Sequence, residues 1–149
     1  MDGRLQVKLF SNWVDYSKNN SDAPLTYINT ECKTINLLQI TYAIYKKGEI
    51  PYSSVEDLIK MNTDFGKKYV LTTINYCIGD CAFGKYATAL LGSDSFEWYQ
   101  IWHLTNGKDF IFVTYICEVV PEEHIRNEAH SIVMNLTIKY KNKPWWRIV

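Results

Sequence analysis

Two apolar runs separated by an Asn-Gly pair constrain the fold of this chain more than any other feature. The runs cover residues 97–104 and 109–116, and the segment between them, 105–108, reads Thr-Asn-Gly-Lys. Asn-Gly is the preferred pair for a two-residue type I′ turn, because both central residues take positive φ angles. The sequence therefore predicts an antiparallel hairpin at this position.

A two-residue turn also predicts the register of the hairpin, with Trp102 opposite Ile111 and Trp98 opposite Tyr115. Both faces of the hairpin are then apolar: one face carries Trp98, Gln100, Trp102, Leu104, Ile111, Val113, Tyr115 and Cys117, and the other carries Tyr99, Ile101, His103, Phe110, Phe112, Thr114 and Ile116. Such a hairpin is either covered by helices on both faces or offers one face to a partner. Covered sheets are the more common arrangement, so we expect a helix on each face.

The sequence contains two helix signals. Ser53 or Ser54 is followed three residues later by a carboxylate, which is capping-box spacing, and the helical period of apolar residues continues to Phe65, with Gly66 as the expected C-cap. The second helix is expected to begin at Pro121. Its apolar stripe consists of Ile125, Ala129, Ile132, Val133 and Leu136.

The remaining apolar segments are typical of strands: 5–9, 25–28, 35–45, 69–77 and 83–91. The run 35–45 is almost continuously apolar and predicts a strand covered on both faces, whereas the segment 11–24 is polar and its residues 19–22 are expected to form a loop. Most connections are too short for parallel crossovers, so we expect an α+β fold, with a largely antiparallel sheet of about six to seven strands flanked by two helices in an α/β/α sandwich. We expect a single domain over residues 1–149, with a peripheral tail at 139–149.

Composition excludes several classes of function. Sixteen basic and sixteen acidic residues give a formal net charge of zero, whereas proteins that coat nucleic acid or anionic membranes usually carry a basic surplus. No apolar run approaches the about 18 residues of a membrane span, and the first residues do not form the apolar segment of a secretory signal. We therefore expect a cytoplasmic protein that binds neither nucleic acid nor membrane.

The sequence contains no recognisable redox, metal-binding or catalytic motif. The four cysteines, Cys32, Cys77, Cys81 and Cys117, are scattered, and the three-residue gap between Cys77 and Cys81 does not match redox or zinc motifs. The histidines, His103, His124 and His130, have no nucleophile and carboxylate in a recognisable arrangement. We expect free thiols, no metal, no cofactor and no enzymatic activity.

The order of these elements resembles the PsbP/DcrB-like superfamily, which includes a yeast Ran-binding protein. The likeness covers residues 5 to 138 and consists of a long strand containing Leu-Gln-Ile-Thr at 38–41, a helix opening with Ser-Val-Glu-Asp-Leu at 54–58, Phe-Gly at 83–84, and the second hairpin strand before a closing helix. The resemblance implies an antiparallel sheet sandwiched between helices. It also implies a non-catalytic role, since members serve as photosystem accessory subunits, envelope lipoproteins, GTPase-binding proteins or chaperones of secreted bacterial effectors.

The abundance of aromatic residues, 15% of the chain, favours a protein-binding module, plausibly a bacterial immunity protein or an effector chaperone. Its anchors would be tryptophans on an exposed patch, for which the candidates are Trp98, Trp102, Trp145 and Trp146. The alternative is a small-ligand-binding protein with a pocket between sheet and helix, lined by Tyr42, Tyr99 and His103. An uncovered apolar face would also be the natural place for a homodimer contact.

Overall fold

The computed structural model describes residues 3–17, 23–46 and 54–141. It contains strands β1 (Gly3–Gln6), β2 (Trp13–Asp15), β3 (Leu25–Asn29), β4 (Asn36–Ala43), β5 (Thr72–Asp80), β6 (Lys85–Gly92), β7 (Trp98–Thr105), β8 (Phe110–Cys117) and β9 (Thr137–Tyr140), and helices α1 (Val55–Lys68) and α2 (Glu123–Met134).

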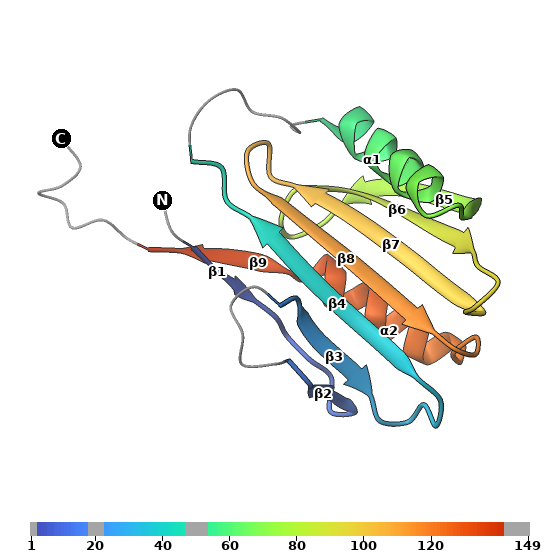
Figure 1. The fold of residues 1–149 in the computed structure, drawn as a ribbon. Coiled ribbons are helices and arrows are strands. Elements are labelled where there is room, and N and C mark those ends of the chain that lie inside the picture. Colours follow the sequence, from blue (N-terminus) through green and yellow to red (C-terminus); the bar gives the residue numbers. More distant parts are fainter. Residues whose placement is uncertain (1–2, 18–22, 47–53, 142–149) are drawn as a thin grey trace, which may run out of the picture.

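Seven of the strands form one sheet, in the order β2-β3-β4-β8-β7-β6-β5, and all of its pairings are antiparallel (Figure 1). This sheet and its two helices confirm the predicted α+β fold class. The sequence analysis missed a second sheet, in which β1 pairs antiparallel with β9. Residues 139 and 140 of the predicted tail therefore belong to the folded body, and the tail beyond Lys141 lies outside the described residues.

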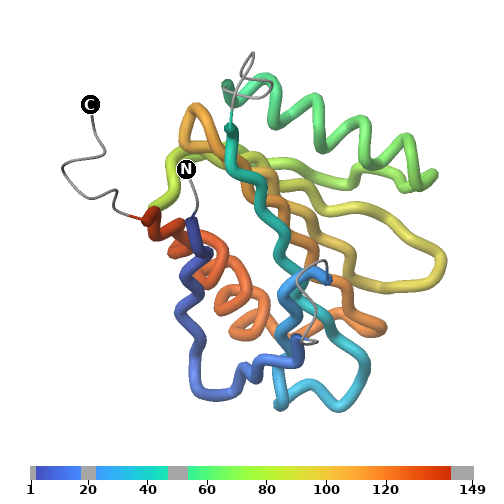
Figure 2. Tube along the Cα trace, turned by 60° about the vertical axis from the view of Figure 1, so that its left-hand side comes forward, coloured from blue at the N-terminus to red at the C-terminus, as the bar shows by residue number. Residues whose placement is uncertain are grey.

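The seven-stranded sheet lies between two outer layers (Figures 1 and 2). Helix α2 and the β1–β9 pair cover one face, hereafter the α2 face. The main hydrophobic core fills this interface and joins Trp102, Val113 and Tyr115 of the sheet to the predicted apolar stripe of α2. Helix α1 lies on the opposite α1 face, over β5, β6 and β7. Neither described helix is long and apolar enough to span a membrane.

Helix α1 begins as the sequence indicates. Ser54 is the N-cap and forms a complete capping box with Asp57. The helix buries Leu58 and packs Phe65 against a small cluster of Ala89, Leu91 and Ile101. Gly66 is not the C-cap, because the helix continues to Lys68. The residue with a left-handed backbone after the helix is Val70, with a φ of 56°.

Helix α2 begins two residues later than predicted. Glu122 is the N-cap residue, so Pro121 precedes the helix and does not occupy its first turn. Proline lacks a backbone N–H and has a fixed φ, and both properties also suit the extended segment that precedes the helix. The predicted stripe is correct: Ile125, Ala129, Ile132 and Val133 are buried, and Leu136 is buried just beyond the helix end.

The hairpin of β7 and β8 forms, but its register differs from the prediction by two residues. Trp102 lies opposite Val113, and Trp98 lies opposite Cys117. The connection contains four residues, 106–109, because the side chain of Asn106 accepts hydrogen bonds from the N–H groups of Lys108 and Asp109 at 3.1 and 2.7 Å. A shift of two residues leaves every side chain on its predicted face.

Coverage of the two faces is less complete than the sequence suggests. In β4, Leu38 and Ile40 are buried on the α2 face, whereas Leu37 and Gln39 are only partly buried on the α1 face. Helix α1 does not extend over β4, so the prediction of a strand covered on both faces was wrong. The polar segment 11–24, for which no strand was predicted, contains β2, and the loop predicted at 19–22 lies outside the described residues.

Candidate functional site

The four candidate tryptophans have different positions in the structure. Trp102 has no exposed surface and belongs to the core, so it cannot be an anchor on a surface patch. Helix α2 covers it, and its indole N–H donates to His130 Nδ1 at 3.2 Å. Trp98 is partly buried and lines a cavity. Trp145 and Trp146 lie outside the described residues.

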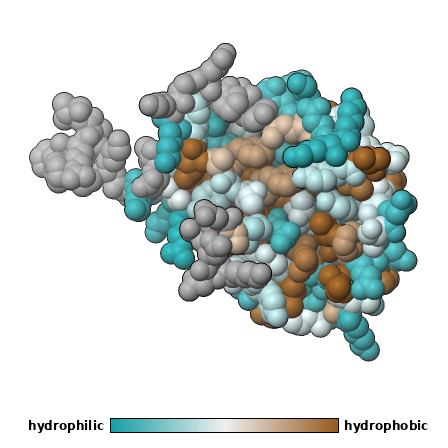
Figure 3. All heavy atoms as spheres, in the orientation of Figure 1, coloured by the Kyte–Doolittle hydropathy of each residue, from teal (hydrophilic) through white to brown (hydrophobic). Residues whose placement is uncertain are grey.

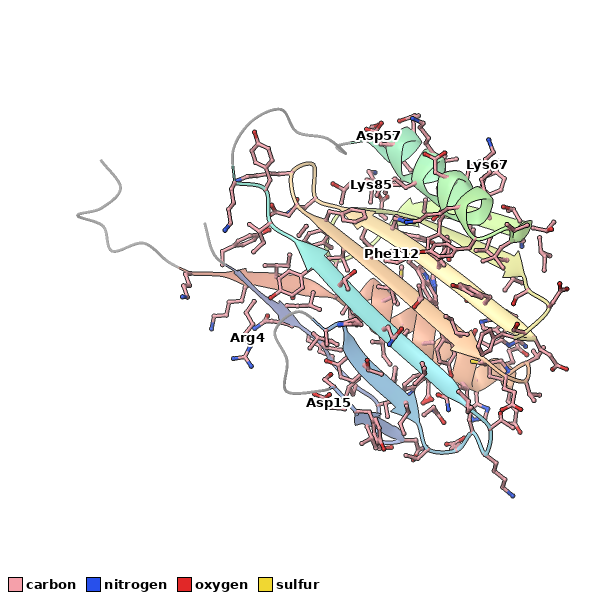
Figure 4. All side chains as sticks on the ribbon, viewed as in Figure 1. Arg4, Asp15, Asp57, Lys67, Lys85 and Phe112 are labelled. Carbon is pink, nitrogen blue, oxygen red and sulfur yellow. The ribbon has the colours of Figure 1, made fainter. Side chains whose placement is uncertain are left out.

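The pocket predicted from Tyr42, Tyr99 and His103 does not form, because the three side chains do not share a face of the sheet. Tyr42 lies opposite Ile111 on the α2 face, and its hydroxyl donates to the carbonyl of Gly3 at 3.4 Å. His103 lies on the α1 face, where Asn62, Phe110 and Phe112 surround it. Figure 4 labels Phe112 on this face, next to α1.

The strongest candidate site is a cavity of about 370 Å³ on the α2 face. Helix α2 packs over the middle of the sheet and reaches Tyr86 of β6 through His130, whereas β5 is exposed. The cavity lies in the resulting angle between helix and sheet, and we call it the Trp98 groove. It is lined by Asn75, Tyr76, Cys77, Tyr86, Thr88, Leu90, Trp98, Gln100, Glu123, Arg126, Asn127 and His130.

Trp98 and Arg126 form the centre of the groove. The guanidinium carbon of Arg126 lies 5.1 Å from the centroid of the Trp98 ring, a cation–π contact. The indole Nε1 of Trp98 and the Nε of Arg126 are buried, and neither has a hydrogen-bond partner among the described residues. Two buried N–H donors at the centre of the groove are therefore unsatisfied within the described part of the chain, which is uncommon in folded proteins.

Hydrogen bonds fix the polar floor of the groove. Gln100 Nε2 donates to Thr88 Oγ1 at 3.0 Å, and the Thr88 hydroxyl donates to the carbonyl of Ile101 at 2.7 Å. Burial lowers the pKa of His130, so its imidazole is neutral at pH 7. Because Nδ1 accepts from the indole of Trp102, the ring proton lies on Nε2.

Cys77 and Tyr86 close the end of the groove at the sheet edge. The Tyr86 ring lies across Gly79, where a Cβ would meet it at 2.9 to 3.1 Å. Burial raises the pKa of the Tyr86 hydroxyl, and its contact with the Cys77 thiol adds to this shift. Cys81 lies four positions after Cys77 along nearly extended chain. At ~3.3 Å per residue their Cα atoms are therefore about 13 Å apart, which is too far for a disulfide. Both cysteines are free.

The groove combines aromatic rings, one guanidinium and several amide and hydroxyl groups. No group of three potential metal ligands occurs among the described residues. Within the same part of the chain, no hydrogen bond joins Cys77 to His130: the thiol contacts the carbonyl of Ile78 at 3.6 Å.

Sequence reasoning found only Trp98 among the residues at the centre of this site. One signal was available for the helical wall: Glu123, Arg126, Asn127 and His130 recur at spacings of three and four, which places them on one side of α2. The contribution of β5 and β6 had no such signal, because it depends on where α2 crosses the sheet.

Comparisons with known proteins identify the fold. No protein-family model matches the sequence, and no curated protein sequence matches it. The solution structure of cyanobacterial PsbP (CyanoP) from Synechocystis sp. PCC 6803 is similar to this chain, with a TM-score of 0.58 and 10% sequence identity, over 90% of this chain and 92% of that chain. The chain therefore has a PsbP-like fold, as the resemblance in its sequence implied.

Proposed function

We propose that this protein is a non-catalytic protein-binding module and that its contact site is the Trp98 groove. The observation that carries this proposal is the pair of Trp98 and Arg126 at the centre of a cavity, 5.1 Å apart. Tryptophan and arginine are the residue types most enriched at the energetic centres of protein interfaces. The finer proposal is a cytoplasmic bacterial immunity protein or an effector chaperone, since both classes act through such contacts.

Exposed apolar surface beside the groove supports a protein partner. Ile74 and Tyr76 on β5 are each 64% exposed. On the α1 face, which also carries Tyr76, Figure 3 shows hydrophobic surface that α1 leaves open, to which Leu37, Ile116 and Ile28 contribute. Contiguous apolar surface of this kind is typical of proteins that associate.

The positions of the histidines support a non-catalytic role. His103 is buried against Asn62, and burial lowers its pKa to about 3. His124 is exposed and pairs with Glu31 at 2.7 Å, a surface ion pair. His130 uses Nδ1 to hold Trp102. Each of these imidazoles is therefore accounted for by packing or by a structural hydrogen bond.

The test is capture of a stoichiometric partner from the native host by the tagged protein, with Arg126→Ala and Trp98→Ala run in parallel. Arg126→Ala removes the guanidinium and leaves the core intact. Tyr16→Ala is the matched control, because Tyr16 is a 68% exposed aromatic residue that does not line the groove. We expect both groove variants to lose the partner and Tyr16→Ala to retain it. A partner that all three variants retain would contradict the proposal.

A small ligand is the second candidate, and the convergent polar groups of the groove favour it. Gln100, Asn127 and His130 contribute polar side chains to one cavity, as small-molecule sites commonly do. A ligand library assayed by thermal unfolding would distinguish the two: a stabilising compound whose effect Arg126→Ala removes would assign the groove to a small molecule.

A further inference from the structure

We propose that two copies of this chain associate along their β5 strands, antiparallel, around a two-fold axis at Cys77. The two sheets would then continue into each other and the two Trp98 grooves would meet at the axis. The importance of that shared groove rests on the function proposed above. The pairing itself depends only on the geometry of β5.

Strand β5 is a sheet edge that lacks, along most of its length, the residues that usually prevent pairing with another strand. It is nine residues long, it is the last strand of the sheet, and it pairs only with β6. From Thr72 to Gly79 it contains neither a charged residue nor a proline, although these are the residues that usually protect an edge from pairing. The opposite edge, β2, has only three residues and ends in Asp15.

The apolar side chains of this edge are open to a second strand. Tyr76 and Ile78 lie on the α1 face and are 64% and 46% exposed. Helix α1 contacts β5 as well as β6, but it leaves these two side chains open. Pairing with a second strand would give the backbone N–H and C=O groups on the free side of β5 hydrogen-bond partners, and it would bury these side chains at the same time.

The register follows from a β-bulge. The pairing of β5 with β6 shifts between Thr73 and Asn75, and it is regular from Asn75 onward. A two-fold axis perpendicular to the sheet must pass at a residue that lies opposite itself. The uncharged regular stretch, Asn75 to Gly79, is centred on Cys77. With the axis there, Tyr76 of each copy lies opposite Ile78 of the other, an aromatic–aliphatic pair that stabilises antiparallel sheets.

A second copy fits this edge for two further reasons. Pairing identical strands normally brings like charges together, and the uncharged stretch from 75 to 79 avoids this cost. Asn75 and Cys77 lie on the α2 face and line the Trp98 groove. The second copy would therefore extend the floor of the groove with its own Asn75 and Cys77, and the two α2 helices would wall a single, symmetric trough.

Cross-linking through the native Cys77 thiol tests the pairing. Residues opposite each other in an antiparallel ladder have Cα atoms about 4.5–5.5 Å apart, within the range of a disulfide. Cys77 is exposed. We expect mild oxidation with diamide to link two chains through Cys77: the two thiols lose two hydrogen atoms to diamide, which becomes the hydrazine. The matched control is the double variant Cys77→Ser/Val14→Cys, whose new thiol lies on the opposite edge strand β2, away from the axis, and is expected to link poorly.

Light scattering coupled to size exclusion, over a wide range of concentration, completes the test. We expect a reversible species of twice the 17.4 kDa chain mass. Ile78→Lys, at a residue that pairs across the axis but does not line the groove, should raise its dissociation constant by at least about ten-fold, since two symmetric pairs are lost. Val14→Lys, on the opposite edge strand at 43% exposure, should leave it unchanged. Circular dichroism verifies that both variants remain folded.

Three results would overturn self-pairing: a monomer at every concentration, a dimer insensitive to Ile78→Lys, or stronger linkage through Val14→Cys than through Cys77. A chain that is monomeric alone but loses a captured partner on Ile78→Lys would assign the edge to a foreign strand. The Trp98 groove is tested separately, because Arg126→Ala should abolish partner capture and leave the dimer intact. A monomer that still binds through Arg126 would overturn only the dimer.

Discussion

Asn62 of α1 and His103 of β7 are hydrogen-bonded to each other in the layer between the helix and the sheet. His103 Nδ1 meets Asn62 Oδ1, and the two residues are 4% and 5% exposed. The imidazole also lies against Phe112, with ring centroids 4.7 Å apart. This polar pair lies in an otherwise apolar layer, so it fixes the position of α1 on the sheet in a way that apolar packing alone does not.

Stability should fall in mildly acidic solution because of His103. Burial lowers its pKa to about 3 from the ordinary 6.5. The unfolded chain therefore binds a proton as the pH falls below 6.5, while the folded chain does not until about pH 3. The stability that neutral His103 contributes above pH 6.5 is therefore lost progressively as the pH falls from 6.5 to about 3. Between pH 7 and pH 5 we expect a loss of roughly 2 kcal/mol from this residue, measured by urea unfolding at both values.

His103→Gln separates this effect from other titrations. Glutamine keeps an amide that can bond to Asn62, but it does not titrate. The variant should lose roughly 2 kcal/mol less than the parent between pH 7 and pH 5. Equal losses in the two proteins would mean that His103 is not held neutral. Burial also lowers the pKa of His130, so a smaller acid sensitivity should remain in the variant.

Local signals were sufficient to predict the elements of the fold, and long-range contacts decided what those signals missed. The capping box of Ser54 and the stripe of α2 can be read within a few residues, and both are present. The hairpin register could not be read in this way. Asp109 accepts a hydrogen bond from the N–H of Tyr45, 64 residues away, and another from the hydroxyl of Tyr140, 31 residues away. These contacts keep Asp109 in the loop and out of the ladder.

Asp109 should therefore be among the most important polar residues for stability. It is 2% exposed, and it ties the segment after β4 and strand β9 to the hairpin. Burial, together with the bond to Asp109, raises the pKa of Tyr140 to about 12. We expect Asp109→Ala to cost about 2–4 kcal/mol and Tyr140→Phe about 1–2 kcal/mol in chemical unfolding. Lys139→Ala, an exposed neighbour in β9, should change stability by less than ~0.5 kcal/mol.

The site was harder to predict than the fold, as Trp98 and Trp102 illustrate. They lie four residues apart on the same face of β7, and their sequence context does not distinguish core from surface. The path of α2 across the sheet determines which tryptophan is buried, because the helix covers Trp102 and leaves Trp98 at the margin of the covered area. Arg126 gains its role only through that packing. A single sequence carries no local signal for such an arrangement of elements.

Substitution of the two tryptophans should therefore have different consequences. Trp102→Ala opens a cavity in the core and leaves His130 Nδ1 without its donor, so we expect a loss of about 3–5 kcal/mol. Trp98→Ala should cost about 2 kcal/mol or less, because the residue is only partly buried at the margin of the main core, where it also contacts Arg126. Thermal and urea unfolding of both variants measure the difference. Equal losses would contradict the assignment of Trp102 to the core and Trp98 to the groove.

Val70 is the residue at which a substitution should stabilise the protein. Its φ of 56° lies in the left-handed region, which costs an L-residue about 1–2 kcal/mol and is least favourable for a β-branched side chain. The backbone is held there because the N–H of Leu71 donates to the carbonyl of Gly66 at 2.8 Å, closing the end of α1. Val70 is 91% exposed, so its side chain contributes almost no apolar burial.

Val70→Gly should therefore raise the free energy of unfolding by about 1 kcal/mol, after the greater flexibility of glycine in the unfolded chain is offset. Val70→Asn should also stabilise, since asparagine tolerates this conformation and is less flexible when unfolded. Val70→Ala keeps the Cβ and is expected to recover less than half of the gain. Urea unfolding of the three variants provides the measurement. A destabilised Val70→Gly would show that the valine side chain makes a contribution that its exposure conceals.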